Sequence, residues 1–205
     1  MDLSYNTGNI FPVPIHVFDI KDFNLYQKDL IDYAYTLKSK EKDAPNRSNV
    51  GGWQSSNFHL NDKNDKLHSV LMDCITSLPP LKKNINIYIR AWVNINIPGS
   101  FNVQHSHPGC DLSGVLWIKC PKESGNIVFY SPSLFESFQE VESYTQDFKD
   151  NNNYHHNYWF PPIEGRMIMF PSHLQHEVKK NLSNEDRISA SFNIKLEDRK
   201  IVWLE

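Results

Sequence analysis

The sequence lacks the features that mark several broad classes of protein. No apolar run among its 205 residues approaches the length of a membrane-spanning helix. The first twenty residues have no basic start followed by an apolar stretch, so we expect no secretory signal. The net charge is only −3 and no stretch is dense in lysine and arginine. We therefore expect a cytoplasmic protein with no membrane contact and no general nucleic-acid binding.

Cysteine is scarce and repeats are missing. The three cysteines, Cys74, Cys110 and Cys120, are odd in number and show no C-x-x-C spacing, which disfavours a disulfide framework or a cysteine metal site. We expect reduced thiols, as in a cytosolic protein. Hydrophobic residues make up 40% of the chain, enough for a sizeable core. With no repeat and no linker, we expect one domain over residues 1–205.

What the sequence does contain is a change of hydrophobic period. Residues 10–20 read as an edge strand or extended arm, which could support a homodimer through residues 11–18. Helical spacing follows over 21–42, where Leu25 and Leu30 are among the apolar positions, and over 61–80. From residue 84 the period is two. Further short strands are expected within 111–119, 125–131, 165–172, 176–180 and 187–196.

Helices first and then many short strands predict a mostly β protein with N-terminal helices. The strand and helices of residues 10–80 would cover one side of an antiparallel double sheet, a jelly-roll core, over residues 84–197. Residues 131–162 show no clear period and are predicted to be an excursion loop; a long loop of this kind is often functional.

Three histidines form the strongest chemical pattern. His105 and His107 are separated by one serine, so both imidazoles point the same way if the segment is extended. His176 follows a strand and a turn at Pro171-Ser172. A distant histidine of this kind could supply a third ligand to a metal held by the first two.

A possible carboxylate clamp follows on the next predicted strand. Arg187 and Ser189 share a face at a period of two, and arginine binds carboxylates through two parallel hydrogen bonds. The competing interpretation is a surface arginine paired with Glu185 or Asp186.

This order of residues resembles the Fe(II)/2-oxoglutarate-dependent dioxygenases, whose core is a double-stranded β-helix similar to that of the cupins. The segment FPSHLQHEV, residues 170–178, is similar to the strand of the distal histidine in their prolyl-hydroxylase-like branch. Together with SNVGGWQS, AWVNIN, HSHPGCDLSGVLW and RISASFNI, it resembles a group of such oxygenases from marine bacteria and their phages. The resemblance covers residues 10–196.

The chain departs from the family pattern at one ligand. The family usually carries a carboxylate two residues after the first histidine, and this chain has His107 there. The metal could be held by His105, His107 and His176, or Asp111 could supply the carboxylate. A third alternative is a halide or water beside only two protein ligands. We favour the three histidines, with Asp111 as the cap of a turn.

The resemblance also implies the cosubstrate site and the reaction. Arg187, assisted by Ser189, would bind the distal carboxylate of 2-oxoglutarate, with Asn94, Asn96 and Gln104 as candidates for its near end. Fe(II) and 2-oxoglutarate would then oxidise a small molecule or a protein side chain, releasing succinate and CO₂; we expect a hydroxylation. Residues 51–55 and 134–162 would select this substrate. The alternatives are a cupin-type dioxygenase without 2-oxoglutarate and a non-catalytic β-sandwich binding module.

Overall fold

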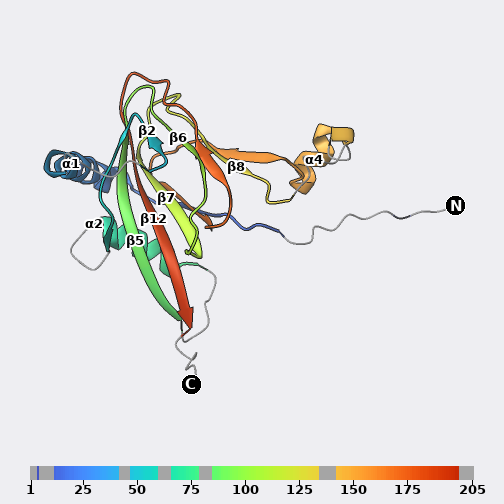
Figure 1. Ribbon diagram of the computed structural model, residues 1–205, viewed down its shortest axis with the longest axis horizontal. Coiled ribbons are helices and arrows are strands. Elements are labelled where there is room, and N and C mark those ends of the chain that lie inside the picture. Colours follow the sequence, from blue (N-terminus) through green and yellow to red (C-terminus); the bar gives the residue numbers. More distant parts are fainter. Residues whose placement is uncertain are drawn as a thin grey trace.

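The strands predicted in the second half of the chain form two facing antiparallel sheets (Figure 1). The computed structural model describes residues 4, 12–41, 47–59, 66–78, 85–133 and 142–198. The larger sheet has the order β1-β10-β7-β12-β5-β3, with β4 also paired to β5, and the smaller sheet has the order β2-β6-β11-β8-β9. The strands are β1 (His16–Asp19), β2 (Asn49–Val50), β3 (Trp53–Gln54), β4 (Phe58–His59), β5 (Ile85–Asn96), β6 (Phe101–His105), β7 (Leu112–Lys119), β8 (Ile127–Tyr130), β9 (Asn157–Phe160), β10 (Arg166–Pro171), β11 (His176–Val178) and β12 (Arg187–Asp198).

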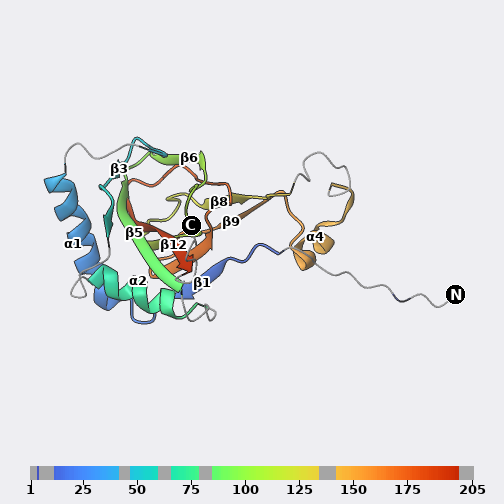
Figure 2. The ribbon, with the colours of Figure 1, turned by 60° about the horizontal axis from the view of Figure 1, so that its bottom comes forward.

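Two helices cover the outer face of the larger sheet (Figure 2). They are α1 (Asn24–Lys40) and α2 (Lys66–Thr76), and both predictions are confirmed. Leu30 and Ala34 of α1 pack with Leu67 and Leu71 of α2 against the sheet. Leu25 belongs to the predicted apolar set but is 70% exposed, because helical spacing puts it on the face of α1 opposite Leu30 and Ala34. Among the described residues no helix is long and apolar enough to cross a membrane.

Side chains of β12 alternate between the hydrophobic core under the helices and the space between the two sheets. Ile188, Ala190, Phe192 and Ile194 are buried in the helix-side core. The intervening side chains, Arg187, Ser189, Ser191 and Asn193, point toward the smaller sheet, because successive side chains of a strand face opposite ways. β5 repeats this division, with Ala91, Val93 and Ile95 in the core and Trp92, Asn94 and Asn96 on the inner face. The sequence therefore makes one face of the sheet apolar and the other polar.

Several short elements were not predicted from the sequence. The strands β2 and β3 are only two residues long and so carry no periodic signal. The predicted excursion loop contains the helix α4 (Gln146–Asn152) and the strand β9. Thr145 caps α4 by accepting a hydrogen bond from the Phe148 amide. Residues 134–141 of the excursion lie outside the described part of the chain.

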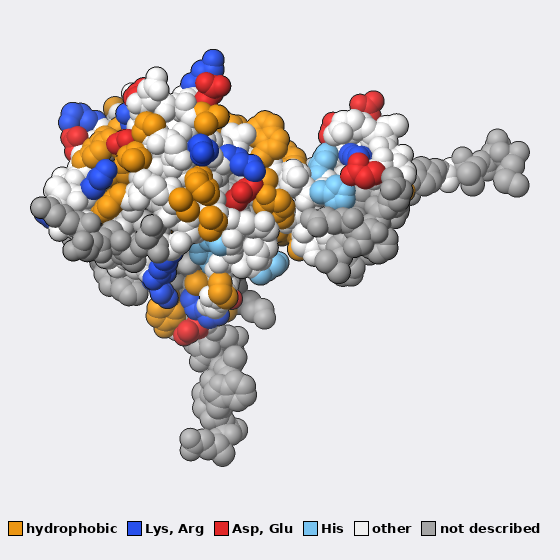
Figure 3. All heavy atoms as spheres, turned by 45° about the horizontal axis from the view of Figure 1, so that its top comes forward, with side chains coloured by type: hydrophobic (Ala, Val, Ile, Leu, Met, Phe, Trp, Pro, Cys, Tyr) orange, Lys and Arg blue, Asp and Glu red, His pale blue; other side chains and the backbone are white. Residues whose placement is uncertain are grey.

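The excursion extends away from the sheets as a separate lobe (Figure 1, Figure 3). His155 and His156 have acidic partners there: His156 Nε2 lies 2.8 Å from Glu142 Oε1, and His155 Nε2 lies 3.5 Å from Asp150 Oδ1. Trp159 of β9 is 55% exposed, whereas the next residue, Phe160, packs against the core cluster that contains Phe129 and Phe170.

Gly114 of β7 is required by close packing. A Cβ atom there would lie 2.3 Å from Cζ of Phe192 and 2.6 Å from the carbonyl oxygen of Ile168. We expect Gly114→Ala to lower the free energy of unfolding by about 1–3 kcal/mol, the usual cost of overpacking a core. Urea unfolding measures the change, and Phe192→Leu in the same chain should recover part of it. A single Gly114→Ala variant as stable as the wild type would contradict the close approach.

Candidate active site

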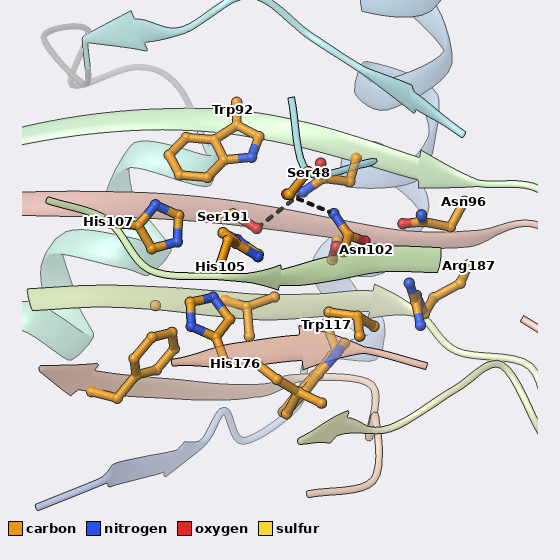
Figure 4. Close-up of a pocket in the computed structure, with 17 residues that line it drawn as sticks. Ser48, Trp92, Asn96, Asn102, His105, His107, Trp117, His176, Arg187 and Ser191 are labelled. Carbon is orange, nitrogen blue, oxygen red and sulfur yellow. Dashed lines mark hydrogen bonds between the residues drawn. The ribbon is translucent and has the colours of Figure 1, made fainter. Parts of the chain in front are cut away.

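His105, His107 and His176 converge between the two sheets (Figure 4). His105 ends β6 and His176 begins β11, and these two residues are direct partners in the antiparallel pair. Their ring centroids lie 4.3 Å apart, and His107, two residues past the end of β6, lies 5.0 Å from His105 and 5.2 Å from His176. One ligand nitrogen from each residue falls within 4.8 Å of the other two. The three predicted ligands therefore meet.

Backbone carbonyls orient two of the three rings. His105 Nδ1 lies 2.7 Å from the Val103 oxygen, and His176 Nδ1 lies 2.9 Å from the Leu174 oxygen. A carbonyl only accepts, so each Nδ1 carries the proton and each Nε2 keeps a free lone pair. This is the tautomer in which a histidine binds a metal through Nε2.

Burial keeps the three imidazoles neutral. It lowers the pKa of His105, and it lowers the pKa of His107 to about 4 with help from the charges of His105 and Arg47. The pKa of His176 falls to about 3, because burial and the neighbouring His105 both oppose its charge. At neutral pH all three rings are therefore uncharged, which is the form that binds metals.

Asp111 does not join the histidines. Its Oδ2 accepts a hydrogen bond of 2.7 Å from the Leu196 amide, and Lys195 Nζ lies 3.2 Å from the same oxygen. Among the described residues, the group placed to hold a metal contains three histidines and no carboxylate. The expected turn-capping role of Asp111 is not what the structure shows, since its side chain binds the backbone of β12.

A cavity of about 60 Å³ extends from the histidines to Arg187 (Figure 4). Arg187 Nη1 donates to the carbonyl oxygens of Ser124 at 2.6 Å and Gly125 at 3.0 Å. The side chain is only 2% exposed, and burial lowers its pKa to about 10, so it stays charged at neutral pH.

The guanidinium has no acidic partner within the described part of the chain. The acids proposed as its surface partners are engaged elsewhere: Glu185 pairs with Lys119, and Asp186 accepts from the Tyr35 hydroxyl. A buried cation without a counter-ion is costly unless a bound anion completes the site. The surface interpretation of Arg187 is therefore wrong.

The remaining predicted residues divide into two groups. Ser189, Asn94 and Asn96 line the cavity and are buried. Asn94 Nδ2 donates to Ser191 Oγ at 3.0 Å, but its Oδ1 is buried without a hydrogen-bond partner among the described residues. Gln104 is exposed and does not line the cavity. The register of β6 with β11 shifts between Asn102 and His105, so these two residues both face the cavity although they are three residues apart, and Gln104 does not.

Several lining residues were not predicted. Ser48, before β2, and Ser191, on β12, face the cavity, and the Trp92 ring lies 5.8 Å from His107. Ser191 continues the pattern begun by Arg187 and Ser189, so a strict period of two would have found it. Residues 51–55, expected near the site entrance, are not among the lining residues; the Trp53 indole instead donates to the Glu41 carbonyl oxygen.

Comparison with solved structures places the fold among known oxygenases. A Pseudomonas putida prolyl-4-hydroxylase matches with a TM-score of 0.58 at 13% identity, over 88% of this chain and 91% of that one. The α-ketoglutarate-dependent carbocyclase SnoK from nogalamycin biosynthesis also has a TM-score of 0.58 at 13% identity, covering 92% and 83%. A Trichoplax adhaerens prolyl hydroxylase, solved with a hypoxia-inducible-factor peptide fragment, has a TM-score of 0.56 at 12% identity, covering 88% and 83%. These likenesses confirm the double-stranded β-helix.

The family itself is shown by the sequence of the core. No curated protein matches this chain significantly. The model of the family described as "Putative 2OG-Fe(II) oxygenase" matches residues 90–193, just over half of the chain, from β5 to β12. The matched region contains all three histidines, Arg187 and Ser189. Membership of the narrower group from marine bacteria and phages stays a prediction, because the family match does not test it. The chain belongs to the 2OG-Fe(II) oxygenases, which are oxidoreductases that use Fe(II) and 2-oxoglutarate.

Proposed function

We propose that His105, His107 and His176 hold Fe(II), and that Arg187, Ser189 and Asn94 hold 2-oxoglutarate, in a single oxygenase domain over residues 1–205. One observation carries this proposal: the same cavity has three neutral imidazoles at one end and a buried arginine without a counter-ion at the other. A dicarboxylate that binds a metal through one end leaves its other carboxylate for such an arginine.

The histidine cluster suits the metal. Imidazole nitrogens are good ligands for Fe(II), and three of them leave further coordination positions open. Bound iron and 2-oxoglutarate together would supply the family's chemistry, in which O₂ is consumed, 2-oxoglutarate becomes succinate and CO₂, and a substrate is oxidised. The three ligands are neutral, so the site carries one negative charge fewer than a site with two histidines and a carboxylate.

The polar face of the larger sheet suits the cosubstrate. The part of the Arg187 fork not bonded to Ser124 and Gly125 can donate to both oxygens of a carboxylate. If the Asn94 amide is turned, Oδ1 accepts from Ser191 and Nδ2 becomes a donor to the same ligand; the two orientations differ only in O and N. The apolar lining residues Trp117, Ile127 and Phe170 exclude water from this space.

The reaction we propose is hydroxylation of a small molecule or a protein side chain. Two of the similar structures are prolyl hydroxylases, one of them with a bound peptide fragment, and this supports a side-chain substrate. Neither a cupin-type reaction without 2-oxoglutarate nor a non-catalytic role is favoured by the family match. The homodimer and the cytoplasmic location stay predictions, the latter in keeping with the free thiols of all three cysteines.

The direct test is absorption spectroscopy under anaerobic conditions. The protein is loaded with one equivalent of Fe(II) and titrated with 2-oxoglutarate, and we expect the visible charge-transfer band of the chelate to saturate at one equivalent. Succinate serves as the control ligand, because it has two carboxylates but no keto group to complete the chelate. Binding of iron without a band would contradict the proposed cosubstrate site, and failure to bind iron would contradict the metal site.

A further inference from the structure

His107 differs from the other two histidines in what orients its ring. His105 and His176 each have a backbone carbonyl beside Nδ1, at 2.7 and 2.9 Å. His107 lies two residues beyond the end of β6. The group beside its Nδ1 is a side chain, the Asn193 amide of β12, at 3.4 Å. At the family's carboxylate position, the hydrogen-bonding group beside Nδ1 is therefore a side chain and not a backbone carbonyl.

Asn193 is itself held by a buried chain of hydroxyls. Ser113 Oγ lies 2.8 Å from Asn193 Oδ1 and 2.7 Å from Ser172 Oγ. Ser113 and Ser172 are almost fully buried. The carbonyl oxygen of Ser172 also accepts a hydrogen bond of 2.9 Å from the His107 amide. The backbone and the ring of His107 are thus both tied to Ser172, in the turn that precedes His176.

The amide can be oriented in two ways, and only one permits metal binding. With Nδ2 toward His107, the amide donates to Nδ1, so the ring proton sits on Nε2 and blocks that ligand atom. With Oδ1 toward His107, Nδ1 donates to the amide and Nε2 is free. In the second orientation Asn193 Nδ2 donates to Ser113 Oγ, and Ser113 donates to Ser172, so every group remains bonded.

We propose that Asn193 is a positioning residue. Its side-chain oxygen accepts a hydrogen bond from Nδ1–H of His107, which leaves Nε2 of that ring free to be the third metal ligand. The proposal rests on the proposed function, since it assigns a role toward the same metal. A histidine ligand oriented by an outer acceptor is a common arrangement, and loss of such a partner typically lowers metal affinity by about 10- to 100-fold. The Ser113–Ser172 pair makes the needed orientation available, because hydroxyls can donate or accept.

Two variants and one spectrum test the proposal. We expect Asn193→Leu, of similar size without a hydrogen-bonding group, to weaken Co(II) binding by about 10- to 100-fold. Asn193→Asp should retain binding, because a carboxylate accepts from both His107 and Ser113. Lys195→Ala is the matched control: it removes the ion pair with Asp111 from the same part of β12 and should leave Co(II) affinity unchanged. Co(II) is titrated into the full chain and followed by its visible absorption.

Long-range ¹H–¹⁵N spectra of the Zn(II)-loaded wild type report the tautomer directly, and they do not depend on whether a variant folds. We expect the proton of His107 on Nδ1. A proton on Nε2 in the metal-loaded protein, or wild-type Co(II) affinity in a folded Asn193→Leu variant, would overturn the role of Asn193 alone. A wild type that binds neither metal would overturn the metal site of the proposed function together with this role.

Discussion

We expect Arg187→Ala to abolish the binding of 2-oxoglutarate without affecting the binding of metal. The guanidinium is buried and has no acidic partner in the described part of the chain, so a bound carboxylate would meet it in a dry environment. Removing one partner of such a buried, hydrogen-bonded charge pair typically costs about 2–5 kcal/mol, or roughly 30-fold to several thousand-fold in the dissociation constant. The chelate band then fails to appear at millimolar 2-oxoglutarate.

Retained metal binding would distinguish the loss of 2-oxoglutarate binding from a general loss of structure. The hydrogen bonds of the described histidines do not involve Arg187, so Co(II) should still bind with wild-type affinity. Arg166→Ala is the matched control, because Arg166 is paired with Asp19 near the sheet edge and should not affect either ligand. Arg187→Lys keeps the charge but loses the fork, and we expect intermediate affinity. An Arg187→Ala variant with normal 2-oxoglutarate affinity would exclude the assigned cosubstrate site.

The sequence could bring several of the predicted site residues together because they lie on or beside strands. Arg187 and Ser189 belong to β12, where a period of two decides which face each side chain joins. The same reasoning separates Ile188 and Ala190, in the core, from Arg187 and Ser189, in the cavity. Extending it by two residues at a time would have added Ser191 and Asn193 to the predicted site.

Other parts of the site depend on contacts between distant segments. Asp111 is four residues from His107 in sequence, and only the approach of Leu196 and Lys195 shows that its carboxylate is engaged. Glu185 and Asp186 adjoin Arg187, yet their partners are Lys119 and Tyr35. The elements β2, β3 and β4 are two residues long, so pairing with β5 and β6 defines them, not their own sequence. No local pattern encodes these choices.

We expect His176→Ala to abolish metal binding. His176 is the most deeply buried of the three histidines. The rings of Phe170 and Phe129 pack against its ring, with centroids 4.8 and 5.9 Å away. These contacts hold the imidazole in one orientation, while the Leu174 carbonyl fixes its tautomer. Losing a direct ligand should cost more than the roughly 10- to 100-fold effect of losing an outer partner. We expect no stoichiometric Fe(II) or Co(II) after anaerobic loading, measured by metal analysis of the desalted protein.

His173→Ala is the control for this result, because His173 lies in the same turn but is exposed, and its loss should leave a full equivalent of metal. Circular dichroism of both variants checks that the sheets remain, since an alanine at 176 also leaves a small cavity beside Phe170. Metal retained by a folded His176→Ala variant would mean that the three convergent rings are a packed cluster, not a ligand set. Metal lost from both folded variants would contradict the placement of His173 outside the metal site.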